Sequence, residues 1–187
     1  MKPELHKIFC QAQNKYRLHR TILKSIAQAE SSFMPRAYRF EPEFYKRLKE
    51  KDAYWADKDP SIVSASYGYM QVLFTTAWAL GAKPSNWKSM KHHEFQALAE
   101  RLYDPATNIG YGAQLCRQLI DRIWAENLPY KFDDLAAWDI ALARYNGGSY
   151  RNPDEAGALR NQKYVDKVWR AWAELRLKEA PCEITQP

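Results

Sequence analysis

Apolar residues recur every three or four positions along most of the chain, which is the period of amphipathic α-helices. The pattern breaks in "PSIVSASYGYMQV", residues 60–72, where β-branched and small residues predict a loop or a short pair of strands. We therefore expect an all-α domain with a minor β or irregular insertion. The expected helices cover residues 5–20, 21–33, 41–57 (polar enough to be partly loop), 74–81, 104–127, 133–148 and 161–177.

Start and stop signals mark several of these helices. Pro35 is expected to end the second helix, because the residue before a proline is pushed out of helical geometry. Asp104 is the expected N-cap of a long helix that has Pro105 at its first position. The apolar stripe of this long helix is expected to be buried, and it consists of Ile109, Ala113, Cys116, Leu119 or Ile120, and Ile123.

A carboxylate stands where the second helix should place another core residue. Ile22 and Ile26 are four residues apart, and Glu30 is the next step on the same face. We therefore expect the Glu30 side chain to point inward. An inward Glu usually pairs with a cation or caps a neighbouring helix, so the rest of the chain must decide between a structural and a chemical role.

Length and composition are those of one globular domain, which we expect to span residues 1–187. The chain is 46% hydrophobic, too rich for disorder, and it has no run of about 18 apolar residues that could span a membrane. Cys10, Cys116 and Cys182 are odd in number and far apart, so we expect neither a disulfide framework nor a zinc site. Cys116 is expected to be a buried thiol, and no metal or cofactor is expected.

A formal net charge of +6 favours polyanionic partners such as nucleic acid, anionic lipid or an anionic cell-wall polymer. The basic residues are dispersed and no nucleic-acid-binding motif occurs, so we expect no nucleic-acid partner. The last predicted helix carries Lys163, Lys167 and Arg170 beside its apolar face. Its basic side either meets an anionic wall or membrane surface or is simply solvated.

Three stretches place polar groups where helices meet loops: "ESSF" at 30–33, "SYGYMQV" at 66–72 and "ARYNGG" at 143–148. In this order they resemble the soluble lytic transglycosylase (SLT) domain family of the lysozyme superfamily. That family shows a Glu-Ser pair, a Gly-x-Met-Gln-hydrophobic stretch and an Ala-x-Tyr-Asn segment. "YDPATNIGYGAQL" is similar to a helix of the same family. The resemblance covers roughly residues 20–170 and implies a lysozyme-like fold.

The resemblance implies peptidoglycan as the substrate, cleaved at the β-1,4 bond between N-acetylmuramic acid and N-acetylglucosamine. Glu30 would be the catalytic residue, first as an acid toward the bridging oxygen and then as a base while the muramic 6-hydroxyl closes a 1,6-anhydro ring. The sequence agrees with an acid that keeps its proton. Desolvation and the negative end of the helix dipole both favour the protonated form.

Five further residues of the matched motifs are candidates for substrate binding: Ser66, Met70, Gln71, Tyr145 and Asn146. The amides of Gln71 and Asn146 suit acetamido groups, or they could orient the catalytic acid. Tyr145 either packs in the core or holds the acid with its hydroxyl. Ser66 either binds an acetamido group or is a turn residue, and Met70 is expected to shape the floor of the cleft.

The segment 34–64 is longer than the corresponding part of the family, and we interpret it as an insertion that could line or cover the cleft. It carries Glu41, set among apolar and aromatic residues in "RFEPEF", which is the candidate for a second carboxylate. A second carboxylate would make the protein a hydrolytic muramidase. The alternative is that the acidic residues of this segment form a solvated face.

Other functional classes stay open, namely a non-catalytic glycan-binding module and a helical nucleic-acid-binding protein. The intact Glu30-Ser31 pair argues against the first. The N-terminus is charged throughout and lacks a hydrophobic stretch, so we expect no Sec signal. A protein made in the cytoplasm that acts on the periplasmic cell wall would suit a phage endolysin or virion-associated lysin, with a bacterial secretion-system hydrolase as the alternative. We expect a monomer.

Overall fold

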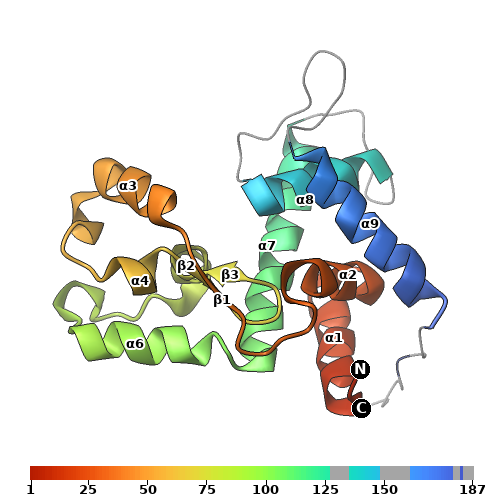
Figure 1. Ribbon diagram of the computed structural model, residues 1–187, viewed down its shortest axis with the longest axis horizontal. Coiled ribbons are helices and arrows are strands. Elements are labelled where there is room, and N and C mark those ends of the chain that lie inside the picture. Colours follow the sequence, from red (N-terminus) through yellow and green to blue (C-terminus); the bar gives the residue numbers. More distant parts are fainter. Residues whose placement is uncertain (127–134, 148–160, 179–181, 183–187) are drawn as a thin grey trace. The chain divides into compact units, whose positions relative to one another are not determined.

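The computed structural model describes residues 1–126, 135–147, 161–178 and 182, and the chain divides into two compact units (Figure 1). One unit consists of Met1–Ala29 and Ala113–Pro187, and the other of Glu30–Gly112. The described residues are mostly helical and include one small sheet, which confirms the expected fold class. None of the described helices combines the length and the apolar character needed to cross a membrane.

The first unit is helical. Helix α1 (Pro3–Tyr16) ends at Arg17, whose φ of 53° is left-handed, and α2 (Arg20–Ser31) follows. Helices α8 (Leu135–Gly147) and α9 (Gln162–Arg176) pack against each other. The start of α8 predicted at Asp133 or Asp134 lies outside the described residues. The core of this unit includes the fully buried side chains of Phe9, Leu18, Leu23, Ile26, Ile120, Ile123, Leu142 and Val165.

Helix α7 (Pro105–Ala125) begins as its sequence predicts. The Asp104 carboxylate accepts a hydrogen bond of 2.8 Å from the Thr107 N–H, which is the contact of an N-cap. The predicted stripe is also confirmed, since each of its members is buried: Ile109, Ala113, Cys116, Leu119, Ile120 and Ile123. Helical periodicity is therefore a sufficient guide to the core face of this helix.

The second unit contains an antiparallel sheet of three strands in the order β1 (Tyr38–Phe40), β2 (Ala65–Tyr67) and β3 (Val72–Leu73). Strands β2 and β3 are the short pair that the broken periodicity predicts. Strand β1 comes from the inserted segment and places Arg39 opposite Ser66. Directly opposite residues of an antiparallel pair share one face of the sheet, so these two side chains are neighbours.

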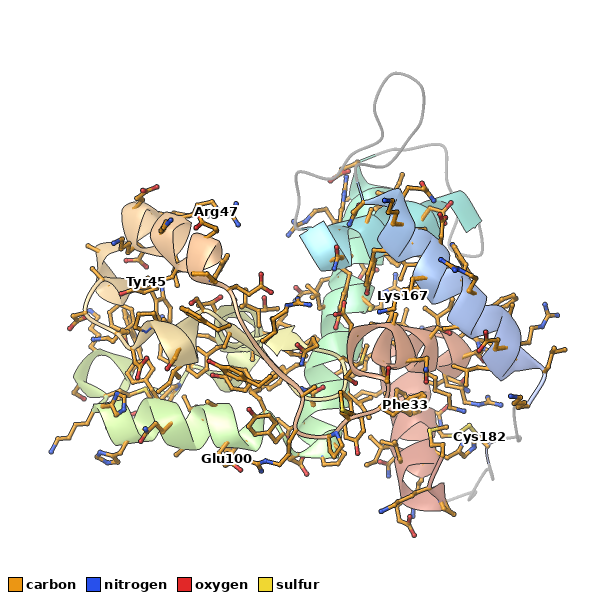
Figure 2. The ribbon with its side chains drawn as sticks, in the orientation of Figure 1. Phe33, Tyr45, Arg47, Glu100, Lys167 and Cys182 are labelled. Atoms are coloured by element: carbon orange, nitrogen blue, oxygen red, sulfur yellow. A yellow bond between two sulfur atoms is a disulfide. The ribbon has the colours of Figure 1, made fainter. Side chains whose placement is uncertain are left out.

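The inserted segment continues into α3 (Pro42–Lys51), which is shorter than the predicted helix over 41–57. Tyr45 lies on α3 (Figure 2). Its hydroxyl contacts the main-chain carbonyls of Trp55, Ala56 and Lys58 at 3.0–3.3 Å and so fixes the turn that follows. The remaining helices of this unit are η1 (Ala53–Trp55), α4 (Pro60–Val63), α5 (Phe74–Ala77), η2 (Trp78–Ala82), η3 (Trp87–Ser89) and α6 (His92–Arg101).

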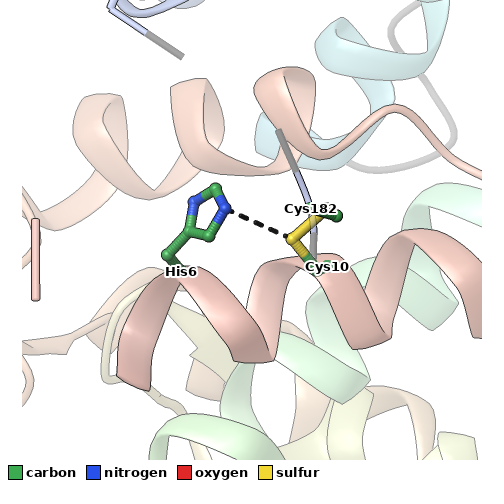
Figure 3. Close-up of side chains that lie close together, drawn as sticks. All are labelled: His6, Cys10 and Cys182. Atoms are coloured by element: carbon green, nitrogen blue, oxygen red, sulfur yellow. Dashed lines mark hydrogen bonds between the residues drawn. A yellow bond between two sulfur atoms is a disulfide. The ribbon is translucent and has the colours of Figure 1, made fainter. Parts of the chain in front are cut away.

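Two of the cysteines are paired, so the expectation of no disulfide is wrong. Cys10 on α1 is bonded to Cys182 near the C-terminus, with 5.9 Å between their Cα atoms (Figure 3). The two residues are 172 positions apart, and no local spacing could reveal their contact. The third cysteine, Cys116, is free and buried as expected, and burial raises the pKa of its thiol.

Candidate active site

Glu30 is the second-last residue of α2, and its side chain is only 5% exposed. The prediction that it points inward is therefore confirmed. The helix ends at Ser31, well before Pro35, because Ser32 and Phe33 adopt left-handed φ angles of 53° and 60°. Residues other than glycine seldom adopt these angles, and such strain is found where the surroundings hold a turn in place.

Ser31 connects the end of α2 to the second motif. Its buried hydroxyl donates a hydrogen bond of 2.7 Å to the main-chain carbonyl of Tyr69. The Glu-Ser pair and the Gly-x-Met-Gln stretch are thus in direct contact within the second unit. The bond fixes the residue that follows Glu30, so it limits how far the turn carrying Glu30 can shift.

Asn108, in the first turns of α7, holds the same loop. Its Oδ1 accepts a hydrogen bond from the Met70 N–H at 2.8 Å, and its Nδ2 donates to the carbonyls of Tyr67 and Leu102 at 2.7 and 2.8 Å. These three bonds explain how a side-chain amide can be fully buried. The sequence pattern does not single out Asn108, although it is the Asn of the "DPATNI" stretch.

Two glycines leave room for this loop. Gly68 has a φ of +70°, and a Cβ there would lie 2.6 Å from Asn108 Nδ2. A Cβ at Gly112 would lie 2.5 Å from Met70 Sδ. The Met70 side chain is fully buried, so it supports the loop from within. The predicted role of Met70 in shaping the floor of the cleft stays a prediction.

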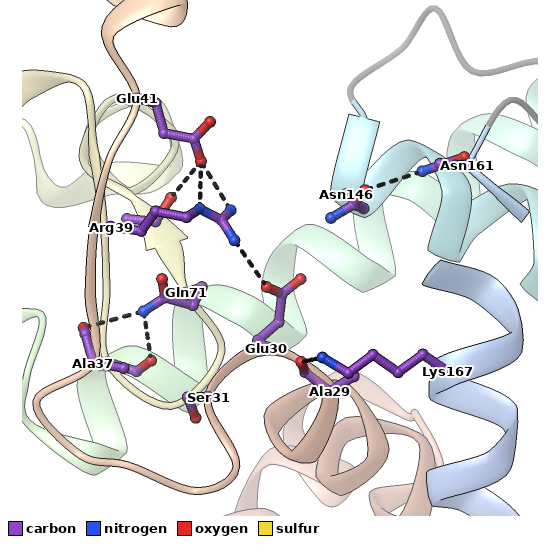
Figure 4. A network of polar contacts seen from close by, with 12 residues as sticks. Ala29, Glu30, Ser31, Ala37, Arg39, Glu41, Gln71, Asn146, Asn161 and Lys167 are labelled. Atoms are coloured by element: carbon purple, nitrogen blue, oxygen red, sulfur yellow. Dashed lines mark hydrogen bonds and ion pairs between the residues drawn. The ribbon is translucent and has the colours of Figure 1, made fainter. Parts of the chain in front are cut away.

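Gln71 closes the loop with a left-handed φ of 46°. Its Nε2 donates to the carbonyls of Ala37 and Gly68, both at 3.1 Å (Figure 4). Both protons of the side-chain amide are therefore used within the protein. The predicted contact of Gln71 with an acetamido group stays a prediction, and it now requires the Gln71 oxygen to accept from the acetamido N–H.

Arg39 lies between two carboxylates (Figure 4). Its Nε and Nη2 donate to one Glu41 oxygen, Oε1, at 3.0 and 2.8 Å. Its Nη1 is 3.9 Å from Glu30 Oε2, which is an ion-pair distance but too long for a hydrogen bond. Ser66 Oγ lies 3.5 Å from the same Glu41 oxygen. The structure thus brings together Glu30, Glu41 and Ser66 of the predicted residues, through an arginine that the sequence pattern does not single out.

The described part of the third motif, residues 143–147, lies on α8 in the first unit. Asn146 is exposed, and its Oδ1 accepts a hydrogen bond of 3.3 Å from Asn161 Nδ2, which also donates to the Ala143 carbonyl at 2.9 Å. Tyr145 is half-buried on the same helix. The predicted roles of Tyr145 and Asn146 at the substrate stay predictions.

Lys167 of α9 binds the end of α2 within the first unit. Its ammonium group donates to the main-chain carbonyl of Ala29, as Figure 4 shows. The last carbonyls of a helix have no partner within the helix, and a basic side chain is a suitable donor for them. Ala29 directly precedes Glu30 in the chain, so Lys167 helps to fix the last turn of this helix.

One group of side chains among the described residues has metal-ligand character: His6, Cys10 and Cys182. The two sulfur atoms are bonded to each other, and a metal requires the thiolate form of cysteine. His6 Nδ1 also lies 3.0 Å from the Lys24 ammonium nitrogen, and a cationic neighbour disfavours a bound cation. This trio therefore does not form a metal site while the disulfide is intact.

The mostly helical fold with one small sheet among the described residues is that of a lysozyme-like protein, and the buried glutamate at the end of α2 is consistent with this class. The sequence matches the family described as transglycosylase SLT domain over residues 7–166. The chain therefore belongs to the SLT domain family, for which peptidoglycan is the substrate. No curated protein and no solved structure gives a significant match.

Proposed function

We propose that this protein is a peptidoglycan lytic transglycosylase in which Glu30 is the catalytic acid and base. The position of Glu30 carries the proposal, since its carboxyl group is buried at the end of α2 beside a turn fixed by Ser31. Burial disfavours the charged form of a carboxyl group and so favours an acid that still has its proton. Membership of the SLT family supports the substrate.

In the proposed reaction Glu30 gives its proton to the bridging oxygen as the bond from this oxygen to C1 of the muramic residue breaks. The 2-acetamido group of the same sugar assists the departure. The muramic 6-hydroxyl then bonds to C1 and returns a proton to the Glu30 carboxylate. No water is consumed, and the product ends in 1,6-anhydro-N-acetylmuramic acid.

Four residues are proposed to bind the polar groups of the glycan: Ser66, Gln71, Tyr145 and Asn146. The Gln71 oxygen would accept from an acetamido N–H, because its nitrogen is already bonded within the protein. Asn146 is exposed and has a donor group to offer. Met70 is proposed to shape the floor of the cleft; its buried side chain fills the space where a Cβ of Gly112 would lie.

Digestion of purified sacculi tests the proposal. Mass spectrometry should find fragments that end in the 1,6-anhydro sugar and lack one added water. Glu30→Gln should abolish the release of these fragments, whereas the matched variant Glu43→Gln should not, since Glu43 is exposed and paired only with Lys46 among the described contacts. A Glu30→Gln protein that keeps more than a small fraction of the wild-type rate would refute the assignment.

The second candidate function is that of a hydrolytic muramidase. The observation that favours it is the position of the Glu41 carboxylate. Glu41 belongs to the same polar network as Glu30 through Arg39. Fragments with reducing muramic ends would identify this reaction, because they contain the added water.

We further propose that the protein acts on the periplasmic cell wall. The Cys10–Cys182 disulfide supports an oxidising compartment, where such bonds form and persist. The charge of +6 supports attraction to an anionic wall or membrane surface. A phage endolysin or virion-associated lysin acting as a monomer would fit this picture.

A further inference from the structure

We propose that Arg39 selects the product of the reaction by holding Glu41 out of it. The inference rests on the proposed function and concerns which nucleophile reaches C1, the muramic 6-hydroxyl or a water molecule. It is drawn from the contacts of the three guanidinium nitrogens of Arg39. Nε and Nη2 donate hydrogen bonds to Glu41, whereas Nη1 only approaches Glu30.

Glu41 has the chemistry of a catalytic base. Inverting glycosidases use a second carboxylate to activate a water, with roughly 6.5–9.5 Å between the two carboxyl groups to leave room for it. Here a single guanidinium group spans the gap between Glu30 and Glu41. Glu41 is also 36% exposed, so water can reach its carboxylate. A free Glu41 would therefore be suited to activate water near Glu30.

The structure holds one of the two oxygens of the Glu41 carboxylate. The hydrogen bonds described for its carboxylate all converge on Oε1, from Arg39 Nε at 3.0 Å, Arg39 Nη2 at 2.8 Å and Ser66 Oγ at 3.5 Å. These three donors occupy Oε1, so this oxygen faces the guanidinium group and the Ser66 hydroxyl and is not available to a water molecule. Paired donors from one guanidinium also fix the direction of the carboxylate.

The backbone sets this arrangement. The pairing of β1 with β2 places Arg39 opposite Ser66, and both side chains reach Glu41. The Glu41 N–H donates to the Ser64 carbonyl at 3.0 Å, which fixes the Glu41 main chain beside the end of β2. The sheet therefore positions the main chain of both Arg39 and Glu41, and the hydrogen bonds between their side chains complete the arrangement.

Arg39 acts differently on Glu30. The 3.9 Å approach of Nη1 is too long to bond the Glu30 carboxyl group, yet it places a positive charge nearby. This charge stabilises the Glu30 carboxylate, so it opposes the effect of burial before the reaction and assists the transfer of the proton to the leaving group. Removing Arg39 therefore affects the rate through Glu30 and the product through Glu41. Only the product ratio reports on Glu41.

Without Arg39, the hydrolytic route opens. A water oxygen bonds to C1 while its proton passes to the Glu41 carboxylate. Glu30 gives its proton to the bridging oxygen as the bond to C1 breaks. The product is a reducing muramic end, and Glu41 then loses its proton to solvent while Glu30 regains one. The solvent supplies the only co-reactant, which is water.

The test measures the share of reducing ends among all new ends, using sacculi digested in water labelled with oxygen-18. The proteins compared are the wild type, Arg39→Gln, Glu41→Gln, the double variant of both, and Arg36→Gln. The share should rise at least threefold in Arg39→Gln and return to the wild-type value in the double variant. Arg36→Gln is the matched control, because Arg36 is an exposed arginine paired with Glu100 outside this network.

Three outcomes would overturn the inference. The first is a share of reducing ends that rises less than threefold in Arg39→Gln. The second is an equal rise of this share in the double variant. The third is a folded Arg39→Gln protein that cleaves nothing. If Arg39→Gln does not fold, Arg39→Lys replaces it, since lysine keeps the charge but cannot donate two fixed hydrogen bonds to one oxygen. An unchanged share in Arg39→Lys would then decide against the inference. Absence of anhydro ends in the wild type would instead refute the proposed function.

Discussion

The Ser31 hydroxyl lies 2.7 Å from the main-chain oxygen of Tyr69 and joins two motifs that are 38 residues apart in the sequence. The same loop is held by Asn108, whose amide bonds both Met70 and Tyr67. The residue that follows the proposed catalytic acid is thereby tied to a loop that is itself held at two further points. Such buried, fully bonded polar groups specify one arrangement of the backbone.

Ser31→Ala should lower the free energy of unfolding by about 1–3 kcal/mol, because the buried Tyr69 carbonyl loses its donor. It should also slow sacculus cleavage, since the turn that carries Glu30 gains freedom. Chemical denaturation and a clearing assay measure the two effects. Ser85→Ala is the control, because Ser85 is exposed, and it should alter neither quantity. Wild-type stability in Ser31→Ala would show that the bond contributes nothing.

The same substitution should have opposite effects at two glycines of α7. A Cβ at Gly112 would lie 2.5 Å from the fully buried Met70 side chain, so Gly112→Ala should destabilise the protein by about 1–3 kcal/mol. A Cβ at Gly110 would meet nothing within 4 Å, so Gly110→Ala should stabilise the helix by up to about 1 kcal/mol. Thermal unfolding of both variants measures the difference. Equal shifts of the melting temperature would contradict the packing argument.

Lys167→Ala should cost about 1 kcal/mol of stability, because the Ala29 carbonyl at the end of α2 loses its donor. Lys163→Ala should cost almost nothing, since Lys163 is exposed on the same helix. Urea denaturation of the two variants makes the comparison, and identical midpoints would exclude the capping role. A test of attraction to anionic sacculi should therefore neutralise Lys163 and Arg170 and leave Lys167 unchanged.

Counting of reactive thiols should distinguish the three cysteines. The native protein should react with no thiol reagent, the denatured protein at Cys116 only, and the denatured and reduced protein at all three positions. Cys116 is protected by burial, which also raises the pKa of its thiol and removes the reactive thiolate. Mass spectrometry after alkylation gives the count. Two modified cysteines in addition to Cys116 without reductant would show that Cys10 and Cys182 are not paired.

Local pattern predicts the features that depend on one element alone. The four-residue step from Ile26 to Glu30 places the carboxylate on the inner face of α2, and Asp104 caps α7 as its sequence indicates. Both depend on residues within a few positions of each other. The same holds for β2 and β3, whose period differs from that of the helices around them.

Features that depend on distant residues could not be predicted in this way. The contact between Arg39 and the two carboxylates requires β1 to pair with β2 in one register, which the sequence of the inserted segment does not reveal. The roles of Asn108 and Gly112 depend on the loop that contains Met70, which lies about 40 positions earlier in the sequence. The sequence shows two glycines in α7, but only packing distinguishes them.

The bond between Cys10 and Cys182 closes almost the whole polypeptide into a covalent ring. A protease that cuts one peptide bond inside this ring therefore opens it without releasing a fragment, and the nicked molecule gains only the mass of one water until a reductant separates the two pieces. The same disulfide makes positions between Cys10 and Cys182 in the sequence suitable for introducing new chain ends, provided that the two cysteines are kept.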